Sequence, residues 1–205
     1  MLQNIKDIVR QVNTLGFLPF FKGEIEGFSI EECLTPDYWF QDEGGGYGVW
    51  DWKNDIMVEA DCAYGKFYRG KACFVSLKWF PDLLNWRRSR YNPSADEQRM
   101  LAAVKERNSL LSSEMKKLCT KGFDGALARL QMGGALMTAD FEYKYTRDGR
   151  AYGWSVARYC TPEAYFGAEC LQTDRTPEES RQRLQLHLAE ALPQASPKQI
   201  DRILD

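Results

Sequence analysis

The chain has 205 residues, of which 44% are hydrophobic and 13% aromatic, enough to build a packed core. It contains no apolar run long enough to span a bilayer, and the charged side chains near its start are unlike a signal peptide, so we expect a cytoplasmic protein without a membrane partner. Six cysteines without paired spacing and a single histidine, His187, predict buried free thiols, no metal site and no cofactor.

The net charge is −2, but the charges are unevenly distributed. Residues 24–62 hold eleven acidic side chains and one basic side chain, Lys53, whereas residues 63–91 hold seven basic side chains and one acidic side chain, Asp82. Aromatic residues lie between the cations of the second stretch, a mixture suited to phosphates and to stacking on unpaired bases. The alternative is that these cations complement the acidic stretch within the molecule.

Residues 1–92 are predicted to form a helical and β-hairpin region. The apolar spacing indicates a helix over 1–15 that ends at Gly16. Capping patterns predict two short helices around Cys33, and the run Gly44–Gly46 predicts a loop. A hairpin over 62–76 is expected to turn at Arg69-Gly70, followed by a short helical element that reaches Trp86.

Residues 93–167 show the element order of a winged helix-turn-helix unit, three helices followed by a β-hairpin wing. The first helix begins at a capping box from Ser94 to Glu97. A short second helix follows Ser112 or Ser113, and the third spans about 123–132, with Gln131 expected on its exposed face.

The wing is the most strongly patterned element. Apolar and polar residues alternate from Met137 to Tyr145, which predicts a half-buried strand. Asp148-Gly149 is a signal for a two-residue turn. That turn would pair the apolar faces of the two strands in the register Tyr145 with Tyr152, Tyr143 with Trp154, and Phe141 with Val156.

Residues 168–205 are predicted to form a C-terminal helical tail. One amphipathic helix starts after Thr176-Pro177, a shorter one starts near Ser196-Pro197, and His187 is interpreted as a packing residue. The whole chain is therefore predicted to be an α+β protein, with an N-terminal α/β segment, a winged helix-turn-helix unit and C-terminal helices.

The candidate functional residues are those expected to contact DNA. The third helix and the turn before it offer few polar groups, and Asp124 opposes phosphate there, so the wing and the basic stretch are the better candidates. The predicted DNA-binding residues are Lys66, Arg69, Lys71, Arg87, Arg88, Lys121, Arg129, Gln131, Lys144, Arg147 and Arg150. The alternative is a scaffold that docks a protein partner, and the carboxylates around Asp51 and Asp55 are interpreted as a solvated acidic surface.

Several segments together carry a resemblance to known proteins: Tyr64–Phe67, Lys71–Ser76, Trp79–Pro81, Gly122–Gly125, Leu130–Met132, Tyr152–Trp154 and Thr161–Glu163. These segments resemble a bacterial family related to the DNA glycosylase AlkZ. The resemblance implies winged-helix DNA binding and a role in DNA repair, and it leaves a glycosylase as a further alternative.

AlkZ-type glycosylases carry a Gln-hydrophobic-Asp motif that positions an attacking water. Here Gln172-Thr173-Asp174 has a polar middle residue and lies in a predicted loop. The resemblance therefore assigns no catalytic residue to this chain.

Overall fold

The computed structural model describes residues 1–40 and 48–205, so the predicted loop at Gly44–Gly46 lies outside the described residues. Six strands form one sheet in which every neighbouring pair is antiparallel, in the order β1-β3-β2-β5-β6-β4. The strands are β1 Phe17–Pro19, β2 Cys62–Tyr68, β3 Lys71–Ser76, β4 Ser109–Leu111, β5 Met137–Tyr145 and β6 Ala151–Cys160.

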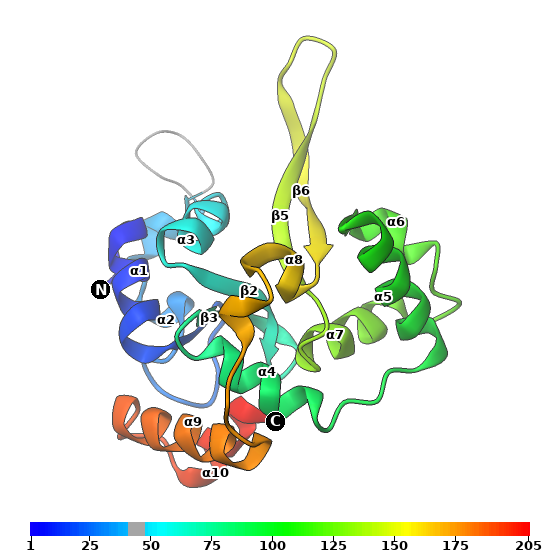
Figure 1. Cartoon of the computed structure of the whole chain (residues 1–205). Coiled ribbons are helices and arrows are strands. Elements are labelled where there is room, and N and C mark those ends of the chain that lie inside the picture. The colour runs from blue at the N-terminus through cyan, green and yellow to red at the C-terminus, as the bar shows by residue number, and fades with distance from the viewer. Residues whose placement is uncertain (41–47) are drawn as a thin grey trace.

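Helices surround this sheet on several sides (Figure 1). The α-helices are α1 Ile5–Leu15, α2 Ile30–Cys33, α3 Lys53–Glu59, α4 Phe80–Arg88, α5 Ala95–Arg107, α6 Ser112–Lys116, α7 Phe123–Met132, α8 Pro162–Phe166, α9 Pro177–Ala191 and α10 Pro197–Leu204. Short 3-10 turns occupy η1 Pro36–Trp39, η2 Gly48–Trp50 and η3 Glu169–Leu171. In the described part of the chain, none of these helices combines the length and apolar character needed to cross a membrane. The predicted α+β class is confirmed.

The first helix ends where its sequence predicts, but it begins at Ile5 rather than at residue 1, because Leu2 pairs with Leu34 in an isolated β-bridge. The Asn4 side chain accepts a hydrogen bond from the Asp7 backbone N–H at 3.0 Å, which caps the helix start. Gly16 has φ +75°, and its N–H donates to the Val12 carbonyl at 2.8 Å, which closes the helix end. A side chain at Gly16 would also collide with the Trp79 ring, so glycine serves both conformation and packing there.

The N-terminal hairpin is also confirmed. Strands β2 and β3 pair from Cys62 with Ser76 to Tyr68 with Lys71, and Arg69 and Gly70 in the turn have φ values of +52° and +71°. Positive φ at both central residues matches the right-handed twist of the strands. Strand β1 pairs with the other edge of β3.

The predicted order of three helices and a hairpin is present from α5 to β6. The capping box of Ser94 and Glu97 starts α5, and α7 spans the predicted residues. Strand β4, which pairs with β6 through Leu110 and Tyr159, is not predicted by the sequence. Identification of this arrangement as a winged helix stays a prediction.

The predicted register of the β5–β6 hairpin is wrong over most of its length. Phe141 pairs with Ala157 and Tyr145 with Ala151, because irregularities fall between Thr138 and Asp140 and again between Glu142 and Lys144. The turn differs as well, since only Gly149 has a positive φ and Thr146 pairs with Arg150 across a three-residue loop. The strict alternation of apolar and polar residues in the sequence does not indicate these bulges.

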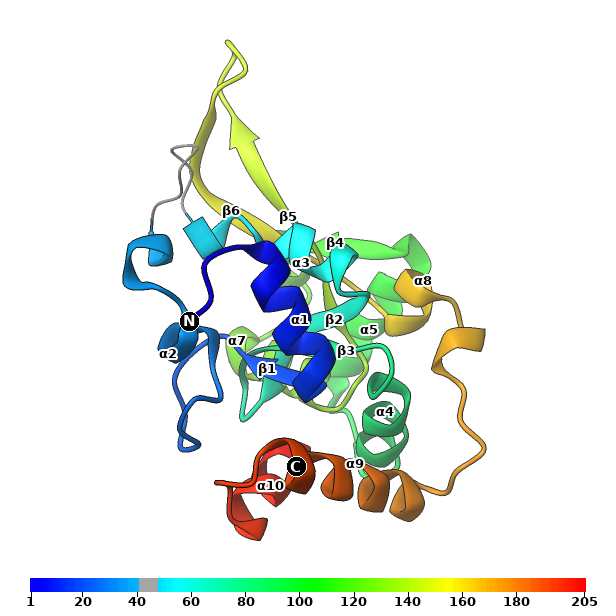
Figure 2. The same ribbon diagram turned by 90° about the vertical axis from the view of Figure 1, so that its left-hand side faces the viewer.

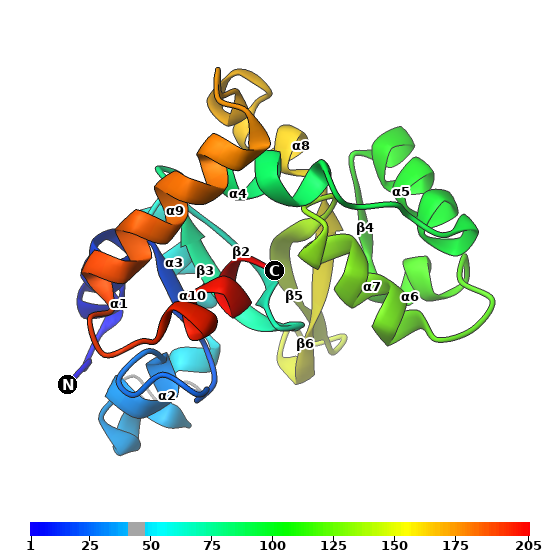
Figure 3. The same ribbon diagram turned by 90° about the horizontal axis from the view of Figure 1, so that it is seen from below.

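Two hydrophobic clusters lie beneath these elements. The larger includes Phe17, Phe74, Leu83 and Leu188, so it joins the N-terminal region to helix α9. The smaller is formed by residues of α5, α6 and α7 with their neighbours, and Figure 3 shows these helices on the opposite side of the molecule from α1 and α9. The predicted division at residues 92 and 167 stays a prediction.

The cysteines are free, as predicted. The predicted burial is confirmed for Cys62, Cys73 and Cys160 but is wrong for Cys33 and Cys119, which are partly exposed, and for Cys170, which is exposed. Among the described residues, no group of three or more His, Cys, Asp or Glu side chains is placed to hold a metal ion.

Candidate functional site

The β5–β6 hairpin extends beyond the helices as an arm (Figures 1 and 2). Two large side chains on the arm are open to solvent, Tyr145 at 65% exposure and Trp154 at 67%. Arg147 and Arg150 are exposed at its tip, where Arg150 forms a salt bridge of 2.5 Å with Asp148. The side chain of Lys144 lies outside the described part of the structure. The arm thus presents aromatic surface and positive charge together.

Lys53 is buried at the base of the arm. This residue starts α3 and is only 7% exposed, and its Nζ lies 3.9 Å from the centroid of the Phe141 ring and 5.3 Å from that of Trp50. In the described part of the chain, no carboxylate comes within salt-bridge distance of this amine. Burial lowers the pKa of Lys53 to about 8, although the Asp51 carboxylate acts in the opposite direction.

Polar groups lie next to Lys53. The Tyr143 hydroxyl donates a hydrogen bond to Asp51, and the Asn54 amide donates to Asp140 Oδ1 at 2.6 Å. Two buried atoms, Trp50 Nε1 and Asn54 Oδ1, lack hydrogen-bond partners among the described residues. We call Trp50, Asp51, Lys53, Asn54, Asp140, Phe141 and Tyr143 the arm-base cluster.

The sequence does not predict this cluster. Its pattern places Asp51 on a solvated acidic surface and shows Lys53 only as the single basic residue of an acidic stretch. Asp51 is half-buried and hydrogen-bonded, while Asp55 is exposed. The sequence signal for this cluster is a lysine that closely follows two tryptophans, Trp50 and Trp52, in a stretch with no other basic residue.

The third helix contributes less than its position in the sequence suggests. Gln131 is 1% exposed, so its predicted exposure is wrong: it accepts the Lys66 backbone N–H at 3.0 Å and donates to the Leu127 carbonyl at 3.1 Å. The end of α7 packs against β2, which covers this residue. Arg129 is exposed but bonds to the buried Glu97 at 2.6 Å, and Lys121 is exposed ahead of the helix.

Arg87 is buried and its hydrogen bonds join separate segments of the chain, so its predicted place on a DNA-binding surface is wrong. It is 6% exposed and donates to the carbonyl oxygens of Phe67, Ile203 and Leu204 at 2.6, 2.9 and 3.0 Å. Burial lowers the pKa of Arg87 to about 10. Its neighbour Arg88 is exposed and bonds to Glu163 at 2.5 Å and to the Gly134 carbonyl at 2.9 Å.

The remaining predicted cations of the basic stretch belong to the β2–β3 hairpin. Lys71 is exposed and Lys66 partly exposed, whereas Arg69 forms a salt bridge with Glu24. Glu24 also bonds to Arg202 on α10, and Figure 1 shows α10 at the end of the molecule opposite the arm tip. The basic stretch and the arm tip therefore do not form one continuous surface.

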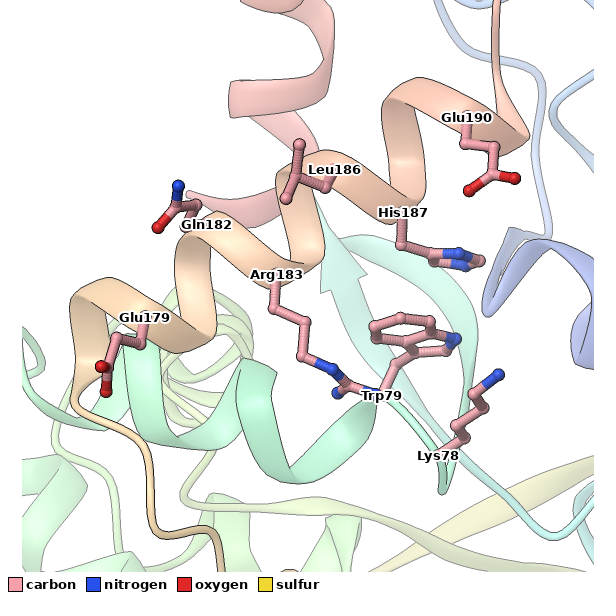
Figure 4. A pocket seen from close by; sticks show the side chains of 8 residues that line it. All are labelled: Lys78, Trp79, Glu179, Gln182, Arg183, Leu186, His187 and Glu190. Atoms are coloured by element: carbon pink, nitrogen blue, oxygen red, sulfur yellow. The ribbon is translucent and has the colours of Figure 1, made fainter.

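A hollow of about 630 Å³ lies beside helix α9 (Figure 4). The His187 ring stacks on Trp79 at 3.9 Å, and one ring nitrogen lies 2.9 Å from the Leu15 carbonyl oxygen. The Arg183 guanidinium lies 4.1 Å from the Trp79 ring and bonds to the buried Asp82. His187 is a packing residue, as predicted, and burial lowers its pKa.

Gln172-Thr173-Asp174 follows η3 in a segment that is neither helix nor strand, as the sequence predicts. Gln172 and Asp174 are exposed. Thr173 Oγ1 accepts a hydrogen bond from Arg175 Nη1 at 3.0 Å.

Comparison with known proteins places the chain in one family. The family profile described as AlkZ related matches residues 2–205, nearly the full length. No curated protein and no solved structure matches the chain. Because the profile spans both hydrophobic clusters and the arm, the chain belongs to the AlkZ-related family.

Proposed function

We propose that this protein binds DNA in a repair-related role and that the β5–β6 arm makes the main contact. The observation that carries the proposal is the arm itself, which combines exposed Trp154 and Tyr145 with exposed Arg147 and Arg150. In this proposal α5, α6 and α7 are the three helices of a winged helix, and the arm is its wing. Membership in a family related to AlkZ supports a connection with DNA repair.

The charge distribution suits contact with the sugar-phosphate backbone. Net charge is −2, so attraction to DNA must come from local positive charge. Both side chains of the Arg150–Asp148 salt bridge are exposed. Exposed pairs contribute little to stability, so a DNA phosphate could replace the Asp148 carboxylate as the partner of Arg150. Base reading by α7 is not part of the proposal, because Gln131 is buried and Arg129 is paired.

Fluorescence anisotropy with labelled duplex DNA at low salt tests this proposal. The double variant Arg147→Glu/Arg150→Glu should weaken binding by about tenfold or more, since it reverses two charges at the contact. Lys6→Glu/Lys198→Glu is the matched control, because it changes the net charge equally at exposed positions on α1 and α10. No binding by the wild type, or equal loss in both variants, would refute the proposal.

A protein partner is the second candidate, favoured by the exposed rings of Trp154 and Tyr145. Pull-down from native lysate with nuclease treatment separates the two candidates. Partners that survive nuclease and are lost in Trp154→Ala would favour protein docking by the arm.

A further inference from the structure

The arm-base cluster combines an amine, apolar rings and unfilled hydrogen-bonding atoms. Among the described residues, Lys53 is held over aromatic rings with no carboxylate within salt-bridge distance, an unusual arrangement because burial of an unpaired ammonium is costly. The rings of Phe141 and Trp50 offset part of that cost through cation–π attraction. Desolvated lysines of this kind are the ones that proteins use as nucleophiles toward carbonyl compounds.

We propose that Lys53 captures the aldehyde of an open-chain sugar, the deoxyribose left at an abasic site in DNA, as an imine. The DNA source of this sugar rests on the proposed function, whereas the reactivity of the amine does not. Only 7% of Lys53 is exposed, which favours a slim open-chain carbonyl over a nucleobase. The position at the base of the arm would bring the amine to DNA that the arm holds.

The chemistry needs no oxidant and no metal. The lone pair of the unprotonated Nζ forms a bond to C1′ of the sugar. The carbonyl oxygen takes up one proton from Nζ and one from solvent and leaves as water, so a protonated imine with a C=N bond remains. Asp51, with the Tyr143 hydroxyl bonded to it, is the carboxylate whose charge acts on Lys53 and would stabilise a protonated imine.

The unfilled atoms are buried, so they would contact the rest of the sugar once the cluster opens to admit it. Trp50 Nε1 can donate a hydrogen bond and Asn54 Oδ1 can accept one, and neither has a partner in the described part of the chain. A hydroxylated sugar supplies both an acceptor and a donor. At pH 7 an amine with a pKa of about 8 is unprotonated in roughly a tenth of the molecules, against less than about a thousandth for an ordinary lysine.

Trapping of the imine tests the proposal. The intact protein is incubated at pH 7 with 2-deoxyribose 5-phosphate and sodium cyanoborohydride, and its peptides are analysed by mass spectrometry. Lys53 should be labelled about tenfold or more faster than Lys78, which lies 5.2 Å from the Trp79 ring but is exposed. Absence of preferential labelling at Lys53 would overturn the proposal, whatever the affinity for DNA.

A second arm uses duplex DNA with one abasic site. Reduction should give a covalent complex with the wild type and with Lys78→Met, and none with Lys53→Met. Duplex carrying a tetrahydrofuran analogue, which has no aldehyde, should bind equally in anisotropy but give no covalent complex. Normal binding to abasic DNA without cross-linking would overturn the proposal while leaving DNA binding intact. Labelling by the free sugar without DNA binding would refute only the proposed function.

Discussion

At the scale of single residues, Lys53 gives the most specific test of the structure. Burial holds its pKa at about 8 against an ordinary value of 10.5, so the folded protein binds this proton less tightly than the unfolded chain. Between these values the unfolded state holds more protons, and the free energy of unfolding should rise with pH. Below pH 8 Lys53 is protonated in both states, and burial of its charge lowers the free energy of unfolding by about 3 kcal/mol at most.

Lys53→Met should therefore be more stable than the wild type at pH 7, by about 1–3 kcal/mol in urea denaturation. The difference between the two proteins should shrink as pH rises from 8 toward 10, since the wild-type cost disappears while other titrating groups are common to both. Parallel pH profiles would contradict a desolvated Lys53.

The burial of single polar side chains is the feature that the sequence predicts least well. Gln131 and Arg87 have polar side chains on helices, and nothing local shows that β2 covers the first or that the C-terminal carbonyls surround the second. Burial of a polar side chain depends on partners 65 or more positions away, as in Gln131 with Lys66 and Arg87 with Leu204.

At the scale of elements, Arg87 fastens three segments together. Its guanidinium, on α4, joins the β2 carbonyl of Phe67 to the α10 carbonyls of Ile203 and Leu204. Arg87→Met should lower the free energy of unfolding by about 3–5 kcal/mol, because buried carbonyls lose their donor. Arg88→Met is the matched control and should cost about 1 kcal/mol, since its salt bridge with Glu163 is exposed.

The free energy of unfolding of both variants is measured by urea denaturation, with tryptophan fluorescence as the signal. Equal losses of stability in Arg87→Met and Arg88→Met would contradict the fastening role. The structure also places Arg87 away from the proposed DNA contact, so a folded Arg87 variant should keep its affinity for DNA.

Elements were the level that the sequence predicted best. Capping residues and apolar periodicity located α1, α7 and the β2–β3 hairpin, because these signals act within a few residues. The predicted strand register of the arm is wrong, because bulges depend on strand twist and on neighbouring strands rather than on the alternation of apolar and polar residues. The three-residue strand β4 carried too little pattern to be recognised.

At the scale of the whole molecule, the structure separates the two basic regions that the sequence offers as candidate DNA contacts. Arg69 is tied to Glu24 and lies toward α10, whereas Arg147 is at the tip of the arm. The sequence revealed the asymmetry of charge but not its direction in space, since direction depends on how the sheet orders β2 and β5. DNA binding should therefore depend on the arm much more than on the β2–β3 turn.

The salt dependence of DNA binding tests the role of the arm most directly. Each phosphate neutralised by a cation contributes about 0.9 to the slope of log affinity against log salt concentration. We expect Arg147→Glu/Arg150→Glu to reduce the steepness of this slope by about 2, and Lys6→Glu/Lys198→Glu to leave it unchanged. A wild-type slope retained by the arm variant would show that the arm does not contact the DNA backbone.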